Sequence, residues 1–223
     1  MIITRTPFRV TLGGGGTDLA SYYAKYGGFI FSFTLNKYMY ITVKRAFADD
    51  LIRIQYSKSE TVSTLSELQH EIARACLQKT GLSKGIEVAS MADIPSGTGL
   101  GSSSTYTVGL LSALHNLKRN FLSLQDLAEE ACEIEIDILK KPMGKQDQYL
   151  AAFGGFLVMN IGKDGSVRAS NANVSLRTLD ELKRNLLIFY TGKQRQNAVR
   201  AAKERAGRVK RRMGPPVTCV SRS

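Results

Sequence analysis

Apolar and polar residues alternate along much of the first quarter of the chain, and this alternation predicts strands. In the segment 38–45, Met, Ile and Val fall at every second position, which is typical of a strand with one buried face. Similar patterns predict strands over 2–12, 29–35 and 51–56, with a turn at residues 36–37. We expect this part of the chain to form a β meander.

Farther along the chain, apolar residues recur every three or four positions, which predicts helices. Gly81 stands where the first helix would end, and Ser123 with Asp126 has the pattern of a capping box that begins a later one. The apolar stripe of that later helix would consist of Leu127, Ala131, Ile134 and Ile138. The predicted helices are 65–80, 102–117, 124–141 and 179–185, the predicted strands are 86–89, 155–160 and 186–190, and 144–148 is predicted as a loop or turn.

The composition is that of a soluble globular protein. The chain has 223 residues, 43% of them hydrophobic, which suffices for one large domain or one and a half typical ones. No apolar run approaches the roughly 18 to 20 residues of a membrane span, and the N-terminus lacks the apolar stretch of a signal peptide. The three cysteines form neither a disulfide framework nor a zinc motif. We therefore expect a cytoplasmic protein that does not bind membranes.

The net charge of +12 is concentrated at the C-terminal end. Residues 193–223 contain ten Lys or Arg residues and one Glu, so they carry +9 of that total, and the rest of the chain is nearly neutral. Basic residues without interleaved aromatic residues contact phosphates only nonspecifically. We expect no specific nucleic-acid partner, and we expect this basic tail to be disordered because its apolar periodicity fades.

The most informative motif lies directly before the predicted helix 102–117. Residues 94–104 read Ile-Pro-Ser-Gly-Thr-Gly-Leu-Gly-Ser-Ser-Ser. Alternating glycines allow several backbone N–H groups to point into one concave site, and the helix that follows adds its positive dipole, so the motif favours phosphate. It is not a P-loop, because no lysine follows Gly101, and not a dinucleotide fingerprint, because its third glycine comes too early. Taken alone, it is also compatible with an ordinary turn that caps a helix.

Two further motifs accompany this loop. The segment 7–18 reads Pro-Phe-Arg-Val-Thr-Leu-Gly-Gly-Gly-Gly-Thr-Asp, and Glu135 precedes the segment 144–148, which reads Gly-Lys-Gln-Asp-Gln. In this order and spacing, the three motifs resemble those of the GHMP kinases, a family of small-molecule kinases, and most of all its branch of heptose 7-phosphate kinases and fucokinases. The resemblance covers about residues 1–192. It implies an α+β fold, a mixed β-sheet with helices of the kind found in a ribosomal protein domain, and an N-terminal ATP-binding domain over 1–185.

The resemblance also implies roles for individual residues. The main-chain amides of the loop would bind the phosphates of ATP, with Ser103 and Glu135 holding Mg²⁺. Asp147 would accept or orient the proton of the acceptor hydroxyl, and Arg9 would keep that carboxylate ionised and stabilise charge on the transferred phosphoryl group. Asp18 would accept hydrogen bonds from the sugar. The residues implied for ATP are Pro95, Gly97, Thr98, Gly99, Leu100, Gly101, Ser102, Ser103 and Ser104, and those implied for the sugar are Gly15, Gly16, Thr17 and Asp18.

These residues also have ordinary structural interpretations. A glutamate on a helix, such as Glu135, is usually solvated; Asp147 could be a turn aspartate and Arg9 a salt-bridge partner within a strand. Three residues that match no motif are interpreted as structural: His70, His115 and Cys132.

Two hypotheses for the function follow. In the first, the chain transfers the γ-phosphate of ATP to the anomeric hydroxyl of D-glycero-D-manno-heptose 7-phosphate, or to another sugar such as fucose. Galactose is less favoured, because galactokinases have an acid–histidine pair where this chain has Gly15 and Gly16. In the second, the chain is a truncated, inactive nucleotide-binding remnant, since residues 186–223 would begin a C-terminal domain and then depart into the basic tail. Apolar surface left by a missing domain would favour self-association.

Overall fold

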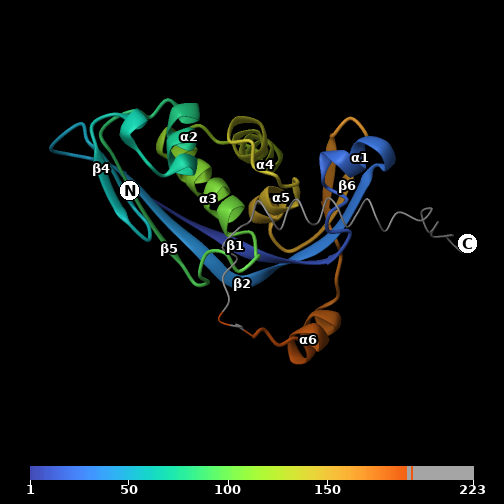
Figure 1. Cartoon of the computed structure of the whole chain (residues 1–223). Coiled ribbons are helices and arrows are strands. Elements are labelled where there is room, and N and C mark those ends of the chain that lie inside the picture. The colour runs from blue at the N-terminus through green and yellow to red at the C-terminus, as the bar shows by residue number, and fades with distance from the viewer. Residues whose placement is uncertain (190–191, 193–223) are drawn as a thin grey trace, which may run out of the picture.

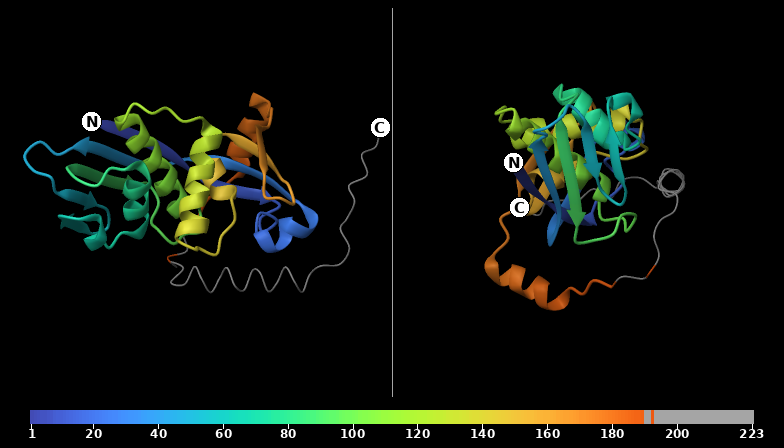
Figure 2. Two further views of the ribbon diagram at one scale, coloured as in Figure 1. Left: turned by 90° about the horizontal axis from the view of Figure 1, so that it is seen from above. Right: turned by 90° about the vertical axis from the view of Figure 1, so that its left-hand side faces the viewer.

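The computed structural model describes residues 1–189 and 192, which form one mixed β-sheet with helices packed on it (Figure 1). One face of the sheet is covered by α2 (Glu71–Thr80), α3 (Ser102–Leu117), α4 (Leu124–Cys132) and α5 (Gln146–Phe153). The helix α6 (Leu176–Asn185) stands apart from this layer, on the other side of the sheet (Figure 2). The predicted α+β class is confirmed, whereas the predicted disorder of the basic tail, residues 193–223, lies outside the described residues. No helix in the described part is long and apolar enough to cross a membrane.

The longest strand, β2 (Gly28–Arg45), runs through the middle of the sheet and pairs antiparallel with β1 (Ile2–Gly13) along nearly its whole length. On its other edge, β2 pairs with β6 (Phe156–Ile161) in its first half and with β5 (Ile86–Ala92) in its second half. The predicted turn at residues 36–37 is therefore wrong. A tight hairpin there needs positive φ angles, which Asn36 and Lys37 do not have, and pairing with β1 on both sides of them keeps the strand continuous.

The other strands make the sheet mixed. β3 (Ile52–Gln55) forms a hairpin with β4 (Ser59–Val62) and runs parallel to β5, and β7 (Val167–Asn171) pairs with β6. The order across the sheet is β4-β3-β5-β2-β6-β7, with β1 beside β2. The predicted β meander is wrong, because β5 lies between β2 and β3, and α2 supplies the crossover that a parallel pair requires.

The helix ends follow the signals in the sequence. α3 confirms the predicted helix 102–117 in full. The predicted helix 65–80 is confirmed from Glu71 onward: α2 ends at Gly81, which has a φ of +70°, while Leu65–Glu67 form a short 3-10 helix, η1. α4 begins where its capping signal predicts, because the Ser123 side chain accepts a hydrogen bond from the Asp126 amide at 3.1 Å.

The predicted helix 124–141 changes character partway. After Cys132, α4 continues as a π-helix, η2 (Glu133–Ile138). Hydrogen bonds in a π-helix span five residues instead of four, so the side chains that follow rotate out of the α-helical stripe. The three earlier members of the predicted stripe are buried, but Ile138 is 49% exposed. The same turn brings Glu135 into the interior, where it is fully buried.

Other segments differ from the prediction at their ends. α5 begins at Gln146, so the predicted loop 144–148 is wrong for its last three residues. α6 begins three residues before the predicted helix 179–185. The predicted strand 186–190 is absent from its described part, 186–189, because no described strand pairs with it. The helix α1 (Ala20–Tyr26) has no counterpart in the prediction.

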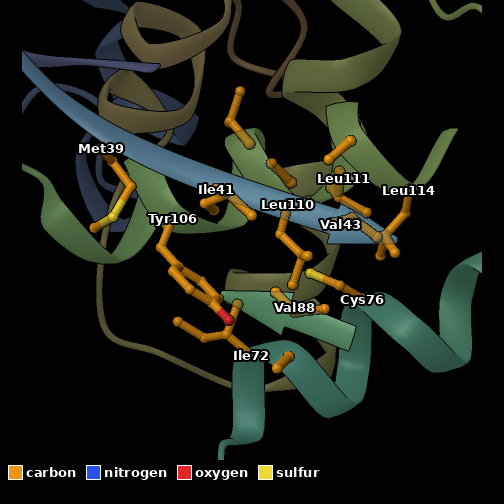
Figure 3. Close-up of a cluster of buried hydrophobic side chains, with 14 of the residues drawn as sticks. Met39, Ile41, Val43, Ile72, Cys76, Val88, Tyr106, Leu110, Leu111 and Leu114 are labelled. Atoms are coloured by element: carbon orange, nitrogen blue, oxygen red, sulfur yellow. The ribbon is translucent and has the colours of Figure 1, made fainter. Parts of the chain in front are cut away.

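The main core lies between the sheet and the helices α2 and α3. Figure 3 shows Leu110 and Leu114 of α3 packed between side chains of β2 and α2. Labelled members of this cluster are Met39, Ile41, Val43, Ile72, Cys76, Val88, Tyr106, Leu110, Leu111 and Leu114. Because α3 is fixed over the centre of the sheet, its N-terminus and the glycine loop before it have a defined position.

Candidate functional site

The glycine loop has the backbone conformation of an anion-binding nest. Gly97, Gly99 and Gly101 have φ angles of +79°, +83° and +83°, a region that other residues seldom adopt. Positive φ at every second residue turns successive N–H groups toward one concave surface. Thr98 closes the turn by donating its hydroxyl hydrogen to the Pro95 carbonyl at 3.2 Å. The loop is thus shaped by its glycines and leaves few side chains in the concavity.

The amides of this loop remain available to a ligand. The N–H groups in the first turn of an α-helix have no partner within the helix. In α3 the N-cap is Gly101, so no capping side chain accepts hydrogen bonds from them either. Arg9 occupies carbonyls of the loop: its Nη1 donates to the Gly99 oxygen at 3.1 Å and its backbone N–H donates to the Leu100 oxygen at 3.4 Å. Within the described part of the chain, the amides of Gly99, Leu100 and Gly101 donate no hydrogen bond. Unpaired amides and the helix dipole together make this end of α3 suited to phosphate.

Arg9 and Asp147 form an ion pair directly beside the loop. The Arg9 Nε donates to Asp147 Oδ1 at 2.6 Å, and the two side chains are 13% and 14% exposed. Asp147 lies in the first turn of α5, where the helix dipole favours a carboxylate. A Cβ atom on Gly101 would lie 3.3 Å from Asp147 Oδ2, so the end of the loop and the carboxylate are in close contact. The structure therefore brings together residues 9, 101 and 147, which are far apart in sequence.

Ser103 and Glu135 form a second polar centre at the start of α3. The Ser103 hydroxyl donates to Glu135 Oε1, and the side-chain amide of Gln148 donates to Glu135 Oε2 at 2.8 Å. The Lys141 ammonium lies 2.8 Å from Ser103 Oγ and 3.3 Å from Glu135 Oε1. Glu135 is fully buried, which contradicts the interpretation of this residue as a solvated surface charge.

The oxygen atoms of this centre are suitable ligands for Mg²⁺. Mg²⁺ prefers oxygen ligands, takes one or two from the protein, and completes its shell with water and substrate phosphates. Ser103 and Glu135 supply two oxygens, and the position of the Lys141 ammonium shows that the pair attracts a cation. A cage made of protein ligands alone is absent from the described residues, which contain no group of three or more His, Cys, Asp or Glu able to hold a metal.

The segment before α1 meets the start of α5. Asp18 is 2% exposed and accepts a hydrogen bond from the backbone N–H of Gln146 at 3.1 Å. Burial raises the pKa of Asp18 above its usual value, an effect that the Gln146 amide partly opposes. A Cβ atom on Gly144 would lie 2.0 Å from Asp18 Oδ2, so only glycine leaves room for this carboxylate.

The neighbours of Asp18 have different surroundings. The Thr17 hydroxyl donates to the Phe29 carbonyl at 2.8 Å and accepts from the Phe29 amide at 3.0 Å, so its hydrogen bonds fix the segment to β2. Gly16, with a φ of +102°, belongs to the turn that leads into α1. Of the residues implied for the sugar, Asp18 is thus the one placed next to the start of α5.

Three consecutive residues at the start of α5 hold three different parts of the site. The Gln146 side chain accepts a hydrogen bond from the Thr11 hydroxyl at 2.7 Å, and its backbone N–H donates to Asp18. Asp147 pairs with Arg9, and the Gln148 side-chain amide donates to Glu135. The sequence assigned no role to the two glutamines or to Lys141. The glutamines flank Asp147 within the segment 144–148, which the sequence predicts as a loop or turn. The structure instead begins α5 at Gln146, and this helix start directs the two glutamine side chains to different neighbours.

A cavity of about 460 Å³ adjoins the glycine loop. Its walls are largely apolar and aromatic, and it reaches the start of α3; the lining includes Met39, Tyr56, His70, Ile72, Met91, Ile94, Pro95, Ser96, Ser102, Ser103 and Tyr106. The His70 ring lies between the Tyr56 and Tyr106 rings, with centroids 4.6 Å and 4.8 Å away. Burial lowers the pKa of His70, which favours its neutral form. A flat, neutral, hydrogen-bonding group fits such a cavity better than a charged one.

A second cavity, of about 560 Å³, has the opposite character. It lies beside α4 and is lined by seven carboxylates and two lysines; the carboxylates are Asp18, Asp126, Glu129, Glu130, Glu133, Asp137 and Asp164. This excess of negative charge disfavours phosphate.

The residues interpreted as structural have structural contacts. His70 also caps α2, because its Nδ1 accepts the Ala73 amide at 3.2 Å. His115 lies 2.8 Å from Glu130 through its Nε2 and contacts Asn120 through its Nδ1. Cys132 is buried, and burial raises the pKa of its thiol well above the usual value, so it is not a nucleophile.

The family model described as the GHMP kinases N terminal domain matches residues 66–155. Residues 66–155 therefore have the sequence pattern of a GHMP kinase N-terminal domain. The matched range contains the glycine loop, Glu135 and Asp147, while Arg9 and Asp18 reach the site from the preceding segment. The likeness of the fold extends beyond this range, as comparison with whole structures demonstrates.

Two relatives are similar over almost all of the chain. A D-glycero-α-D-manno-heptose 7-phosphate kinase of Campylobacter jejuni is 29% identical over 96% of this chain and 65% of its own length. A crystal structure of a D-glycero-D-manno-heptose 1-phosphate kinase from Bacteroides thetaiotaomicron is 29% identical and has a TM-score of 0.80, covering 92% of this chain and 69% of that one. The galactokinase of Lactococcus lactis, complexed with galactose, shares the fold at 16% identity and a TM-score of 0.60. The chain therefore spans about two thirds of the length of the heptose phosphate kinases it matches.

Proposed function

We propose that the chain is a sugar-phosphate kinase, which transfers the γ-phosphate of ATP to the anomeric hydroxyl of D-glycero-D-manno-heptose 7-phosphate. The observation that carries this proposal is the contact of the Arg9–Asp147 pair with the glycine loop. Phosphoryl transfer requires a phosphate cradle and a group that orients the attacking hydroxyl, next to each other. The heptose 7-phosphate acceptor is taken from the name of the Campylobacter jejuni relative. The Bacteroides structure is named as a heptose 1-phosphate kinase and so supports a heptose phosphate kinase without supporting this acceptor.

ATP would bind with its phosphates on the loop amides and its base in the neighbouring cavity. The unpaired amides of residues 99–101 and the uncapped start of α3 provide hydrogen bonds and a positive dipole for the phosphates. The aromatic cavity opens beside the same loop and includes Ser102 and Ser103 in its lining. A nucleoside in this cavity would therefore lie close enough to the start of α3 for its phosphates to reach the loop amides.

Ser103 and Glu135 would hold Mg²⁺, and the bound ion would neutralise charge on the β- and γ-phosphates. The protein prepares this pair with Gln148, which fixes the orientation of the Glu135 carboxylate from the side opposite Ser103. Because Glu135 is fully buried, its carboxylate oxygens are shielded from bulk water.

Asp147 would accept or orient the proton of the acceptor hydroxyl. Its Oδ1 is held by Arg9, so its orientation is fixed before substrate arrives. The Arg9 guanidinium also donates to the Gly99 carbonyl of the loop, and it would stabilise the charge that spreads during transfer. Asp18 lies next to the Gln146 amide and would accept hydrogen bonds from the sugar near the attacking hydroxyl.

The test is an assay of ADP release with Mg-ATP and D-glycero-D-manno-heptose 7-phosphate, with the product identified by ³¹P NMR. We expect a heptose 1,7-bisphosphate and slower turnover with fucose or galactose. Phosphate added at another position, or a preference for fucose, would contradict the acceptor assignment. Nucleotide binding without turnover on any of these sugars would contradict the kinase proposal and favour an inactive nucleotide-binding protein.

A further inference from the structure

Lys141 occupies the polar centre that is proposed to hold Mg²⁺. Its ammonium lies 2.8 Å from Ser103 Oγ and 3.3 Å from Glu135 Oε1, so it contacts both oxygens of the pair. None of the three sequence motifs includes this lysine. Its side chain is 26% exposed, whereas the Glu135 side chain is fully buried.

The backbone holds Lys141 over this pair. The π-helix ends at Ile138, and Lys140 has a φ of +52°, one of two positive values among the described residues other than glycine. This conformation turns the chain back, and the Lys141 amide donates to the Glu135 carbonyl at 2.9 Å. Lys141 is thus tied to Glu135 twice, by main chain and by side chain, and only the side chain can move without breaking the end of the helix.

The contact has an electrostatic reason. A buried carboxylate is costly unless a charge or several hydrogen bonds compensate it. Gln148 and Ser103 each donate one hydrogen bond to Glu135, and Lys141 supplies the positive charge. Mg²⁺ binds oxygen at about 2.0–2.1 Å, and an ammonium on the same two oxygens would both repel it and block the approach.

We propose that Lys141 is a displaceable cation, which neutralises the Ser103–Glu135 pair before Mg²⁺ binds and must leave it when the metal arrives. This inference rests on the proposed function, because it assumes that the pair takes Mg²⁺. Lysine has a flexible stem and Lys141 is partly exposed, so its head can move toward solvent while its backbone stays in place. Metal affinity is then set by competition with a charge built into the protein.

The test uses Mn²⁺ alone, titrated into the full chain without nucleotide and followed by electron paramagnetic resonance. We expect Lys141→Met to bind Mn²⁺ with a dissociation constant lower by about tenfold, because one competing charge is removed. Lys140→Met is the matched control: it removes the same charge from the exposed neighbouring residue and should bind Mn²⁺ as the parent chain does. Glu135→Gln tests the metal site itself and should abolish the binding.

A second measurement separates competition from a change in folding. Without metal, Lys141→Met should unfold at a lower temperature than the parent, because Glu135 loses its compensating charge; saturating Mn²⁺ should raise its melting temperature more than that of the parent. Lys141→Gln, which keeps a hydrogen-bonding group, serves if the methionine variant does not fold. Equal Mn²⁺ affinity in the parent and both Lys141 variants, or weaker binding in these variants, would overturn the inference. Binding that is unaffected by Glu135→Gln would overturn the metal assignment in the proposed function instead.

Discussion

The glycine loop and the acidic residues opposite it are held in position in different ways. The loop consists of backbone at positive φ, with amides that have no partner in the described chain. The acidic side consists of carboxylates that each have dedicated partners: Arg9 for Asp147, and Ser103, Gln148 and Lys141 for Glu135. The first region is open to a ligand and the second is already satisfied. We infer that the loop supplies binding, whereas the acidic side supplies orientation and charge.

The largest effect should come from the acidic side. Asp147→Asn keeps the shape of the side chain but removes the charge that accepts or orients the proton, so kcat should fall by about 10²–10⁴-fold. Nucleotide affinity should stay unchanged, because the loop amides are untouched. Steady-state kinetics and calorimetric titration of a non-hydrolysable ATP analogue measure the two quantities separately.

Asp137→Asn is the control for this change, since it removes an exposed carboxylate from the π-helix that carries Glu135. It should leave kcat as it is. Loss of nucleotide binding in the Asp147 variant would contradict the division of roles between the two regions.

A smaller effect, with the opposite signature, should come from the loop. Gly101→Ala places a Cβ atom 3.3 Å from Asp147 Oδ2 at a φ of +83°, so it both strains the loop and crowds the carboxylate. We expect the dissociation constant for the ATP analogue to rise by at least about tenfold, an effect of about 1.4 kcal/mol. Calorimetry measures this change directly.

Gly81→Ala is the matched control. Gly81 has a φ of +70°, but a Cβ atom there meets no atom within 4 Å. Both substitutions should lower the free energy of unfolding by about 1–2 kcal/mol through left-handed strain, but Gly81→Ala should leave nucleotide affinity unchanged. If the two variants bound the analogue equally well, the loop would not be the phosphate site.

The smallest effect concerns the pH dependence of stability. Because burial raises the pKa of Asp18 above 3.8, the folded state holds this proton more tightly than the unfolded chain does, and stability from Asp18 falls as pH rises through the folded pKa. Asp18→Asn should therefore raise the free energy of unfolding at pH 7, by on the order of 1 kcal/mol, and the gain should vanish below pH 3.8. Urea unfolding at several pH values tests this.

The comparison residue is Asp49, whose pKa is lowered, chiefly by its hydrogen bonds to Arg53. Asp49→Asn should lose stability at neutral pH rather than gain it. If Asp18→Asn also lost stability at neutral pH, the buried carboxylate of Asp18 would not be destabilising the folded state. In the kinase assay, Asp18→Asn should raise KM for the sugar, so the more stable variant is expected to be the poorer enzyme.

The sequence predicted the local conformation of the glycine loop and the start of the helix after it. The glycine spacing before residue 102 predicts a nest and a helix start, and the structure has both. These features depend on neighbours in the chain: glycine permits the positive φ, and the apolar spacing after it forms the buried face of α3. The pairing of Arg9 with Asp147, and of Ser103 with Glu135, followed from a family resemblance rather than from the pattern of either segment.

The features that the sequence did not predict depend on contacts between distant segments. β2 stays extended through Asn36 and Lys37 because β1 pairs on both sides of them. The π-helical turn that buries Glu135 has no local signal, because its residues fit an α-helical pattern equally well. Lys141 follows that turn, so its contact with the Ser103–Glu135 pair depends on a helix end that has no local signal in the sequence.

The most direct test of the central claim is an amide ¹H–¹⁵N correlation spectrum of the labelled chain, recorded with and without a non-hydrolysable ATP analogue and Mg²⁺. The account predicts that the largest shift changes fall on the amides of residues 97–103, which have no other partners or begin α3, with smaller changes around the aromatic cavity. Changes centred on the acidic cavity beside α4, with the loop amides unmoved, would contradict it.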